Sequence, residues 1–220
     1  RLMRLARQAA QLGFTPDFPT LFGAKFNAAL IGKISVERIF SELMLILHAD
    51  EKYGIPYAQY NGLKVLQSTD VLRYILPELA LGDGMPQRAD FHDHDVLEHS
   101  LRTVKYADRR IRLAALLHDV GKPYCYANFG NYHRHEIEGA RIAEEILTRL
   151  KAPIKVIEDT VALTRTHMYD LNNQTKESKI RAFIVENYAL YPRILLIKQA
   201  DYSGCKDDLH VCPTVRRWTE

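Results

Sequence analysis

The 220-residue chain has no long hydrophobic run, since no apolar stretch approaches the roughly 18 residues that a membrane span requires. It also has only three cysteines, Cys125, Cys205 and Cys212, whose spacing matches neither a disulfide framework nor a structural zinc site. We therefore expect a water-soluble, cytoplasmic protein that does not contact a membrane. No role for Cys205 or Cys212 follows from the sequence.

The chain also lacks a strong excess of charge of either sign. Lysine and arginine number 30 against 27 aspartate and glutamate residues, which leaves a net charge of +3 at pH 7. This mild basicity permits a phosphate-bearing ligand but falls short of the basic footprint typical of nucleic-acid binders. With 47% hydrophobic residues, a chain of this length can bury a core without a metal or a disulfide.

Apolar residues recur at intervals of three and four, and no segment shows the alternation of a β-strand. We therefore predict an all-α protein. Gly121 and Pro123 are expected to end the most apolar helix. The helices are predicted over residues 2–12, 36–47, 96–107, 111–119, 137–150, 154–164, 180–185 and 194–200.

The turn-forming stretch from Gly82 to Gln87 is the best candidate for a boundary between two parts. We divide the chain there into residues 1–84 and 85–220. The chain starts with Arg1 inside a predicted helix, without a secretory signal, and we expect it to be a fragment of a longer protein.

Polar residues occur at the ends of the buried helices of the second part. His118 and Asp119 end the most apolar helix, and a buried polar pair must have partners or a metal. His99 precedes them with a turn midway, so two antiparallel helices would bring His99 level with His118. Asp201 follows the apolar run 194–197 and would enter the same interior. The sequence predicts a metal site at His99, His118, Asp119 and Asp201.

Mixed nitrogen and oxygen ligands suit Mn, Fe, Co, Zn or Mg, and a bound cation can lower the pKa of its water to about 7. His135 opens the following helix and His167 closes the next one. They could hold a second metal bridged by Asp119, or hydrogen-bond a substrate phosphate, while Lys122 could add a positive charge. We predict catalytic roles for Asp119, Lys122, His135 and His167.

Other interpretations remain open for some of these residues. His118 and Asp119, taken singly, could form an ordinary hydrogen-bonded pair in the core. His133 competes with His135, which we prefer because the periodic helix starts beside it. His92 and His94 precede the first motif helix and are interpreted as loop histidines rather than ligands.

The order His99, His118-Asp119, His135, His167, Asp201 resembles the signature of the HD-superfamily phosphohydrolases. Residues 1–14, 35–39 and 76–79 are similar to the neck and body of bacterial CCA-adding tRNA nucleotidyltransferases and poly(A) polymerase-like proteins, and residues 95–99 and 139–141 extend the similarity. The paired aspartates of that family's nucleotidyltransferase head are missing. The resemblance implies an RNA-binding-like helical neck and body at 1–84 and an HD-domain helical bundle at 85–220.

The resemblance further implies a metal-dependent phosphohydrolase, acting as a phosphomonoesterase or a 2′,3′-cyclic phosphodiesterase on nucleotides or RNA 3′ ends. Its expected partners are a nucleotide or RNA-end phosphate, with tRNA as a further candidate. Two alternatives stay open: a tRNA-binding module whose HD site is not catalytic, and a hydrolase of signalling nucleotides. The sequence predicts neither the metal's identity nor the oligomeric state.

Overall fold

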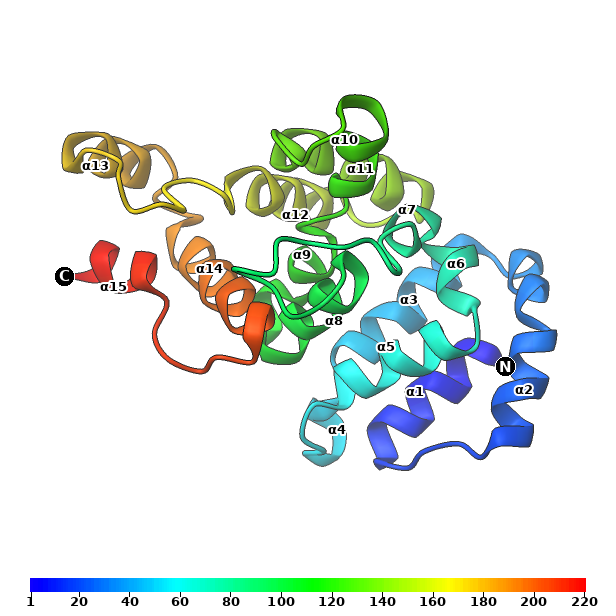
Figure 1. Cartoon of the computed structure of the whole chain (residues 1–220). Helices are drawn as coiled ribbons and strands as arrows, with labels where there is room; N and C mark the ends of the chain where they lie inside the picture. The colour runs from blue at the N-terminus through cyan, green and yellow to red at the C-terminus, as the bar shows by residue number, and fades with distance from the viewer.

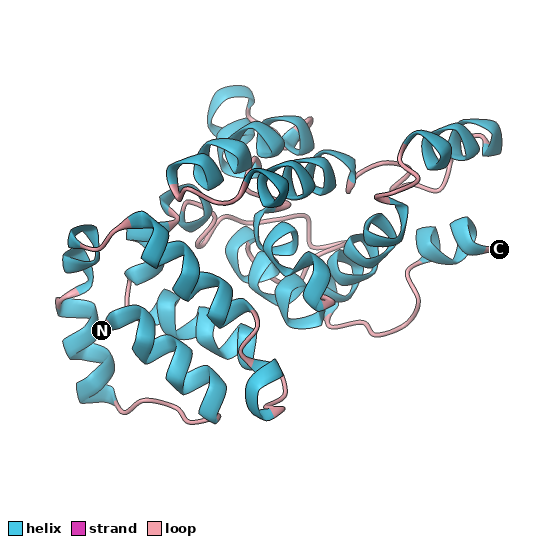
Figure 2. Cartoon of the chain, turned by 180° about the vertical axis from the view of Figure 1, so that it is seen from behind, coloured by secondary structure: helices cyan, strands magenta, loops and turns pink.

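The computed structural model describes residues 1–220, and these form helices and turns without any strand (Figure 2). The predicted all-α class is therefore confirmed. Helices α1 to α6 form one bundle that contains the N-terminus, while α8, α9, α11, α12 and α14 lie beside it and α13 and α15 lie at the far end (Figure 1). No helix is both long and apolar enough to cross a membrane.

The helices of the two parts have the following bounds. In the first part they are α1 (Leu2–Leu12), α2 (Phe18–Phe26), η1 (Ala28–Lys33), α3 (Val36–Leu47), α4 (Asp50–Tyr53), α5 (Ala58–Ser68), α6 (Val71–Ile75) and α7 (Pro77–Ala80). In the second they are α8 (Val96–Tyr106), η2 (Arg109–Ile111), α9 (Arg112–Leu117), α10 (Lys122–Phe129), α11 (His135–Arg149), α12 (Ile154–Thr166), α13 (Glu177–Glu186), α14 (Tyr191–Lys206) and α15 (Pro213–Thr219).

Local sequence explains where the helices that matter for the site begin and end. Gly13 ends α1 in the left-handed conformation with φ of 71°, which glycine adopts without steric cost. Asp95 caps α8 by accepting a hydrogen bond from the backbone N–H of Glu98 at 2.7 Å. This cap fixes the start of the helix that carries His99.

Three expectations about the second part were wrong in detail. Gly121 and Pro123 do not simply end a helix, because Pro123 lies in the first turn of α10, where its missing N–H costs no helical hydrogen bond. The predicted helix over 111–119 is instead the short turn η2 followed by α9. Asp201 lies within α14 rather than after it, because the helix continues to Lys206 beyond the apolar run.

The two parts of the chain share one hydrophobic core. A single cluster of 38 buried residues runs from Met3 in α1 to Trp218 in α15. Arg112 adds a buried polar link, donating to Asp50 Oδ1 and Oδ2 at 2.6 and 2.7 Å and to the carbonyl of Leu47 at 2.8 Å. The division after residue 84 stays a prediction.

Candidate metal centre

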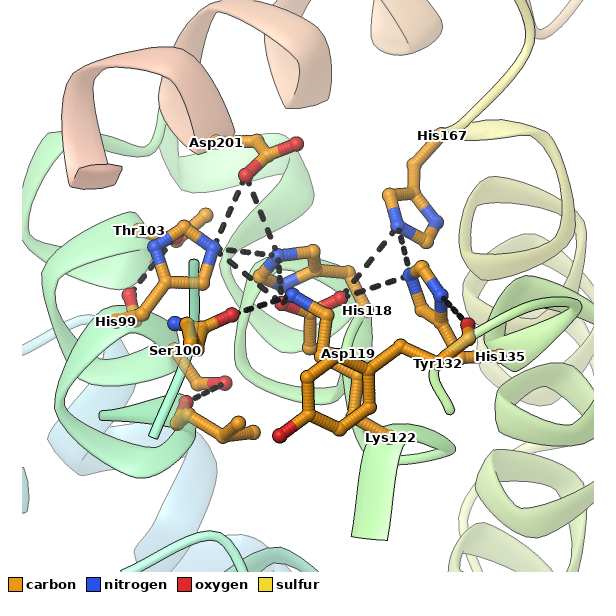
Figure 3. Close-up of polar contacts among 12 residues, drawn as sticks. His99, Ser100, Thr103, His118, Asp119, Lys122, Tyr132, His135, His167 and Asp201 are labelled. Carbon is orange, nitrogen blue, oxygen red and sulfur yellow. Dashed lines mark hydrogen bonds and ion pairs between the residues drawn. The ribbon is translucent and has the colours of Figure 1, made fainter. Parts of the chain in front are cut away.

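Six polar residues predicted from the sequence meet between the helices of the second part. They are His99 in α8, His118 and Asp119 directly after α9, His135 at the start of α11, His167 directly after α12 and Asp201 in α14. All but Asp201 are fully or almost fully buried, and the side chain of Asp201 is 16% exposed. Figure 3 shows these side chains pointing toward one another around Asp119.

The first group comprises His99, His118, Asp119 and Asp201. His99 Nε2 lies 3.0 Å from Asp201 Oδ1, 3.1 Å from His118 Nε2 and 3.4 Å from Asp119 Oδ2. His118 Nε2 lies 3.3 Å from Asp119 Oδ2 and 3.5 Å from Asp201 Oδ1. The antiparallel arrangement expected for the helices of His99 and His118 does bring the two rings together.

The second group lies on the opposite side of Asp119 (Figure 3). His135 Nε2 is 3.1 Å and His167 Nε2 is 3.7 Å from Asp119 Oδ1, and the two Nε2 atoms are 3.3 Å apart. Asp119 thus directs Oδ2 toward one pair of histidines and Oδ1 toward the other. The two oxygens of this one carboxylate therefore face both groups.

The backbone fixes the tautomer of three of the four histidines. A carbonyl oxygen can only accept, so each Nδ1 that contacts one must donate its proton, and in the neutral form of the same ring the Nε2 carries the lone pair. These bonds orient each ring on its own turn of chain, as in metal sites where the outer nitrogen is held by the backbone. The contacts are His118 Nδ1 to Ala115 O at 2.8 Å, His135 Nδ1 to Tyr132 O at 2.8 Å and His167 Nδ1 to Thr164 O at 2.6 Å.

The facing nitrogen atoms of His135 and His167 indicate that the residues of the site can hold a cation. The Nε2 lone pairs of His135 and His167 face each other at 3.3 Å, and two acceptors cannot hydrogen-bond without a proton or a cation between them. Two ligands about 2.0 to 2.1 Å from one cation lie roughly 2.9 to 3.4 Å apart. Most of the distances within the two groups have this spacing, and the trios His99, His118, Asp119 and Asp119, His135, His167 could each hold a metal ion.

The electrostatics of the site pair buried carboxylates with neighbouring positive charges. Burial alone lowers the pKa of His118, but the adjacent Asp119 carboxylate outweighs it and raises this pKa to about 10. Burial raises the pKa of Asp119, yet the charges of His118 and Lys122 hold it well below its ordinary value. The pKa of Asp201 is likewise low, because hydrogen bonds from His118 and His99 outweigh its burial. The two carboxylates are therefore anionic, and His118 and Lys122 are the positive groups beside Asp119.

Lys122 supplies part of that charge. Its Nζ lies 2.5 Å from Asp119 Oδ2 and 2.7 Å from Gln87 Oε1. Gln87 was not predicted as a site residue, because it belongs to the turn stretch used only as a boundary. Its amide nitrogen donates to the carbonyls of His94 and Asp95 at 3.2 and 3.3 Å, which ties the loop before α8 to the site.

The other histidines weighed in the sequence lie in different surroundings. His92 is in a loop as expected, but its ring packs against that of His99 with 4.8 Å between centroids, and burial lowers its pKa to about 3. His94 points to Asp207 at 3.9 Å. His133 is exposed, whereas His135 is buried in the second group.

The close contact between Gly121 and the first turns of α11, which include Gly139, sets the position of His135. A Cβ atom on Gly121 would lie 2.3 Å from the carbonyl oxygen of His135 and 2.5 Å from the nitrogen of Gly139. Only glycine leaves room for α11 to come this close to the segment that carries His118 and Asp119.

Comparison with known proteins identifies two families along the chain. Residues 96–202 match the HD domain family, and residues 13–81 match the family described as the probable RNA and SrmB-binding site of polymerase A. The first match contains all six residues of the candidate centre, and the second lies within the predicted first part.

Several curated relatives align with most of the chain. The A-adding tRNA nucleotidyltransferase of Deinococcus radiodurans is 31% identical over 94% of this chain and 49% of its own length. The CC-adding tRNA nucleotidyltransferase of Thermus thermophilus is 33% identical over 75% of this chain and 38% of its own length. The multifunctional CCA protein of Azoarcus sp. is 31% identical over 76% of this chain and 41% of its own length.

The chain thus spans about half the length of the first of these relatives and less of the other two. The resemblance noted in the sequence is confirmed by both family matches and by these alignments. The chain thus contains a polymerase A-type RNA-binding segment followed by an HD domain, and over 94% of its length it is homologous to the C-terminal region of a tRNA nucleotidyltransferase.

Proposed function

We propose that the HD domain of this chain is a metal-dependent phosphohydrolase that cleaves phosphomonoesters or 2′,3′-cyclic phosphodiesters of nucleotides or RNA 3′ ends. The observation that supports this proposal best is the placement of Asp119 between two histidine pairs, at 3.3 and 3.4 Å on one side and 3.1 and 3.7 Å on the other. Hydrolysis of phosphate esters is the chemistry that such paired histidine and aspartate sites suit.

His99, His118, Asp119 and Asp201 would hold one divalent cation, and His135 and His167 would hold a second that shares Asp119. The bound cations would polarise a phosphoryl oxygen and lower the pKa of water. Mixed imidazole and carboxylate ligands are compatible with Mn, Fe, Co, Zn or Mg, and the ligand set alone does not select among them.

Lys122 is proposed to bind a phosphate oxygen of the substrate. Its Nζ reaches Asp119 while its stem is buried, so its position is fixed before substrate arrives. Gln87 accepts from the same Nζ and would keep Lys122 in place. A positive charge at this point would offset the negative charge that the phosphate brings to the site.

A panel of substrates tests this proposal. The purified chain is stripped with a chelator, reloaded separately with Mn, Co, Mg or Zn, and offered 2′,3′-cyclic AMP, 3′-AMP, 5′-AMP and an RNA oligonucleotide ending in a cyclic phosphate. We expect cation-dependent cleavage that His135→Gln reduces and that His210→Gln spares, because the side chain of His210 is 90% exposed and outside the site. No cleavage with any cation would reject the hydrolase.

A second proposed function is tRNA binding by residues 13–81. It is supported by the match to an RNA-binding family and by relatives whose names describe tRNA nucleotidyltransferases. In this case the chain would hold tRNA for nucleotide addition by a longer protein, and the HD site would not be catalytic. Retarded tRNA migration together with an inactive HD site would favour this alternative. Cleavage confined to guanosine tetraphosphate would instead favour a signalling-nucleotide hydrolase.

A further inference from the structure

A third group of metal-ligating side chains combines His99 with two residues outside the proposed phosphohydrolase centre. His92, His99 and Cys205 each offer a ligand atom, and these atoms lie within 4.8 Å of one another. His99 is fully buried, and the other two side chains are partly buried. The centre described above uses neither His92 nor Cys205.

The fold places these three residues together for clear reasons. Cys205 follows Asp201 by one helical turn on α14, so the two side chains share a face that packs against α8. The backbone N–H of Asp93 donates to the carbonyl of Cys205 at 3.2 Å. This bond holds the loop of His92 against the same turn of α14.

Two nitrogen atoms in this group are buried without any hydrogen-bond partner. They are the Nδ1 atoms of His92 and His99. The Nδ1 atoms of His118, His135 and His167 all donate to backbone carbonyls, so His99 is the exception among the four histidines of the centre. An unpaired buried polar group costs about 1 to 3 kcal/mol, and a group that persists at this cost calls for a ligand.

We propose that His92, the Nδ1 of His99 and Cys205 form a separate site for a thiophilic divalent cation of the zinc and cadmium class. Two imidazoles and one thiolate are ligands that such ions prefer, whereas the centre beside it offers imidazoles and carboxylates but no thiolate. When the cation binds, the Cys205 thiol releases its proton to solvent and the sulfur forms the bond to the metal.

Occupation of this site changes what His99 can do for the neighbouring centre. A neutral imidazole carries one proton, so a cation on Nδ1 leaves the proton on Nε2. That nitrogen then donates to Asp201 Oδ1 at 3.0 Å and has no lone pair for a second metal. A thiophilic cation bound at Cys205 therefore prevents His99 from binding a cation in the proposed phosphohydrolase centre.

Cadmium titration of the chelator-treated chain tests the site without any assay of hydrolysis. We expect an ultraviolet thiolate-to-cadmium absorption band that saturates at one equivalent and disappears in Cys205→Ser. His92→Gln should weaken cadmium binding by at least about tenfold. Removing a direct ligand should lower the metal affinity at least as much as removing a residue that only hydrogen-bonds to a ligand. Cys125→Ser, Cys212→Ser and His135→Gln are the matched controls and should keep the band. A band that survives Cys205→Ser, or binding that His92→Gln leaves unchanged, would overturn the site.

Inhibition provides a second measurement, and this one rests on the proposed hydrolase activity. Micromolar zinc added to the manganese-loaded chain should inhibit the wild type more strongly than Cys205→Ser, while both hydrolyse equally without zinc. Equal inhibition of the two proteins would contradict this effect on His99. If the chain hydrolyses nothing, the cadmium titration still decides whether the cation site exists.

Discussion

His135 and His167 face each other through their Nε2 atoms at 3.3 Å, while a backbone carbonyl accepts the Nδ1 proton of each ring. Two lone pairs at this distance repel unless a cation or a proton lies between them. The pair comes from α11 and the end of α12, so the repulsion acts directly on the packing of those helices.

We therefore predict that a divalent cation stabilises the chain. At a hundredfold excess over Kd, binding contributes about 2.7 kcal/mol to the free energy of unfolding. For a chain of this size this raises the Tm by roughly 5 to 10 °C. Differential scanning calorimetry of chelated and Mn-loaded protein measures the shift. His135→Gln should reduce it and His210→Gln should not; identical Tm values with and without cations would disprove a specific site.

Asp119 is predicted to be the residue most sensitive to substitution. Its two oxygens face both histidine pairs, so Asp119→Ala removes a ligand from each group at once. We expect hydrolysis to fall by at least about a thousandfold, which corresponds to roughly 4 kcal/mol in the activation barrier. Circular dichroism should show a largely intact helical fold, because the substitution also removes a buried charge.

The comparison with His135→Ala reports the number of cations that act. A mild loss in His135→Ala beside a severe loss in Asp119→Ala indicates one cation, and equally severe losses indicate two. Wild-type rates in Asp119→Ala would refute the assignment, and loss of the fold would indicate a structural metal instead.

Gly121→Ala is predicted to displace His135 without touching any side chain of the site. The new Cβ would meet the backbone of His135 and Gly139 at 2.3 and 2.5 Å, so α11 must move. Overpacking of this kind costs about 1 to 3 kcal/mol. Metal analysis should show weaker binding at the second group, with the first retained. Gly32→Ala is the control, since nothing lies within 4 Å of its Cβ position. If Gly121→Ala binds as much cation as the wild type, α11 can shift without displacing His135 from the second group.

Acid is predicted to release the C-terminal helix before the rest of the chain unfolds. Trp218 Nε1 and Arg217 Nη1 both lie 2.9 Å from Asp170 Oδ2. Burial raises the pKa of Asp170, but the hydrogen bond from Trp218 and its other partners hold it below the ordinary value. A lowered pKa in the folded state contributes stability above the unfolded value of about 3.9, and this is lost as pH falls through the folded value.

Trp218 is the only tryptophan of the chain, so its fluorescence reports this contact directly. We expect its emission to shift to the red as the pH falls below about 4. In Asp170→Asn the emission should not change over this pH window, because no carboxylate is left to titrate. Asparagine tolerates the positive φ of 58° at this position, so the variant keeps the turn. Superimposable titrations of wild type and Asp170→Asn would exclude the mechanism.

The sequence was sufficient to predict which polar residues would meet. His118 and Asp119 end an unusually apolar helix, and a polar pair at the end of such a helix has few options inside a core. Helical periodicity with one turn between two helices was enough to pair His99 with His118. The ligand roles of these residues stay predictions, although their proximity is observed.

Other features depend on contacts between segments that no local pattern encodes. Gln87 lies in a turn, and only the packing of that loop on α10 brings it to Lys122. The sequence around His92 is that of an ordinary loop. The backbone hydrogen bond from Asp93 to Cys205 holds this loop against α14, and the ring of His92 packs against that of His99. The short helix α10 was missed because Pro123 can begin a helix as well as follow one.

The ion pair between Arg112 and Asp50 helps to fix the position of His118 in the candidate metal centre. Arg112 begins α9, which is only 6 residues long, and His118 stands at its other end. The start of α9 is bonded to the first part of the chain, because Arg112 donates hydrogen bonds to Asp50 and to the carbonyl of Leu47. The first part of the chain, which contains none of the predicted ligands, thus helps to position the predicted ligand His118. A displacement of the first part at Asp50 would therefore reach His118 through a helix of less than two turns.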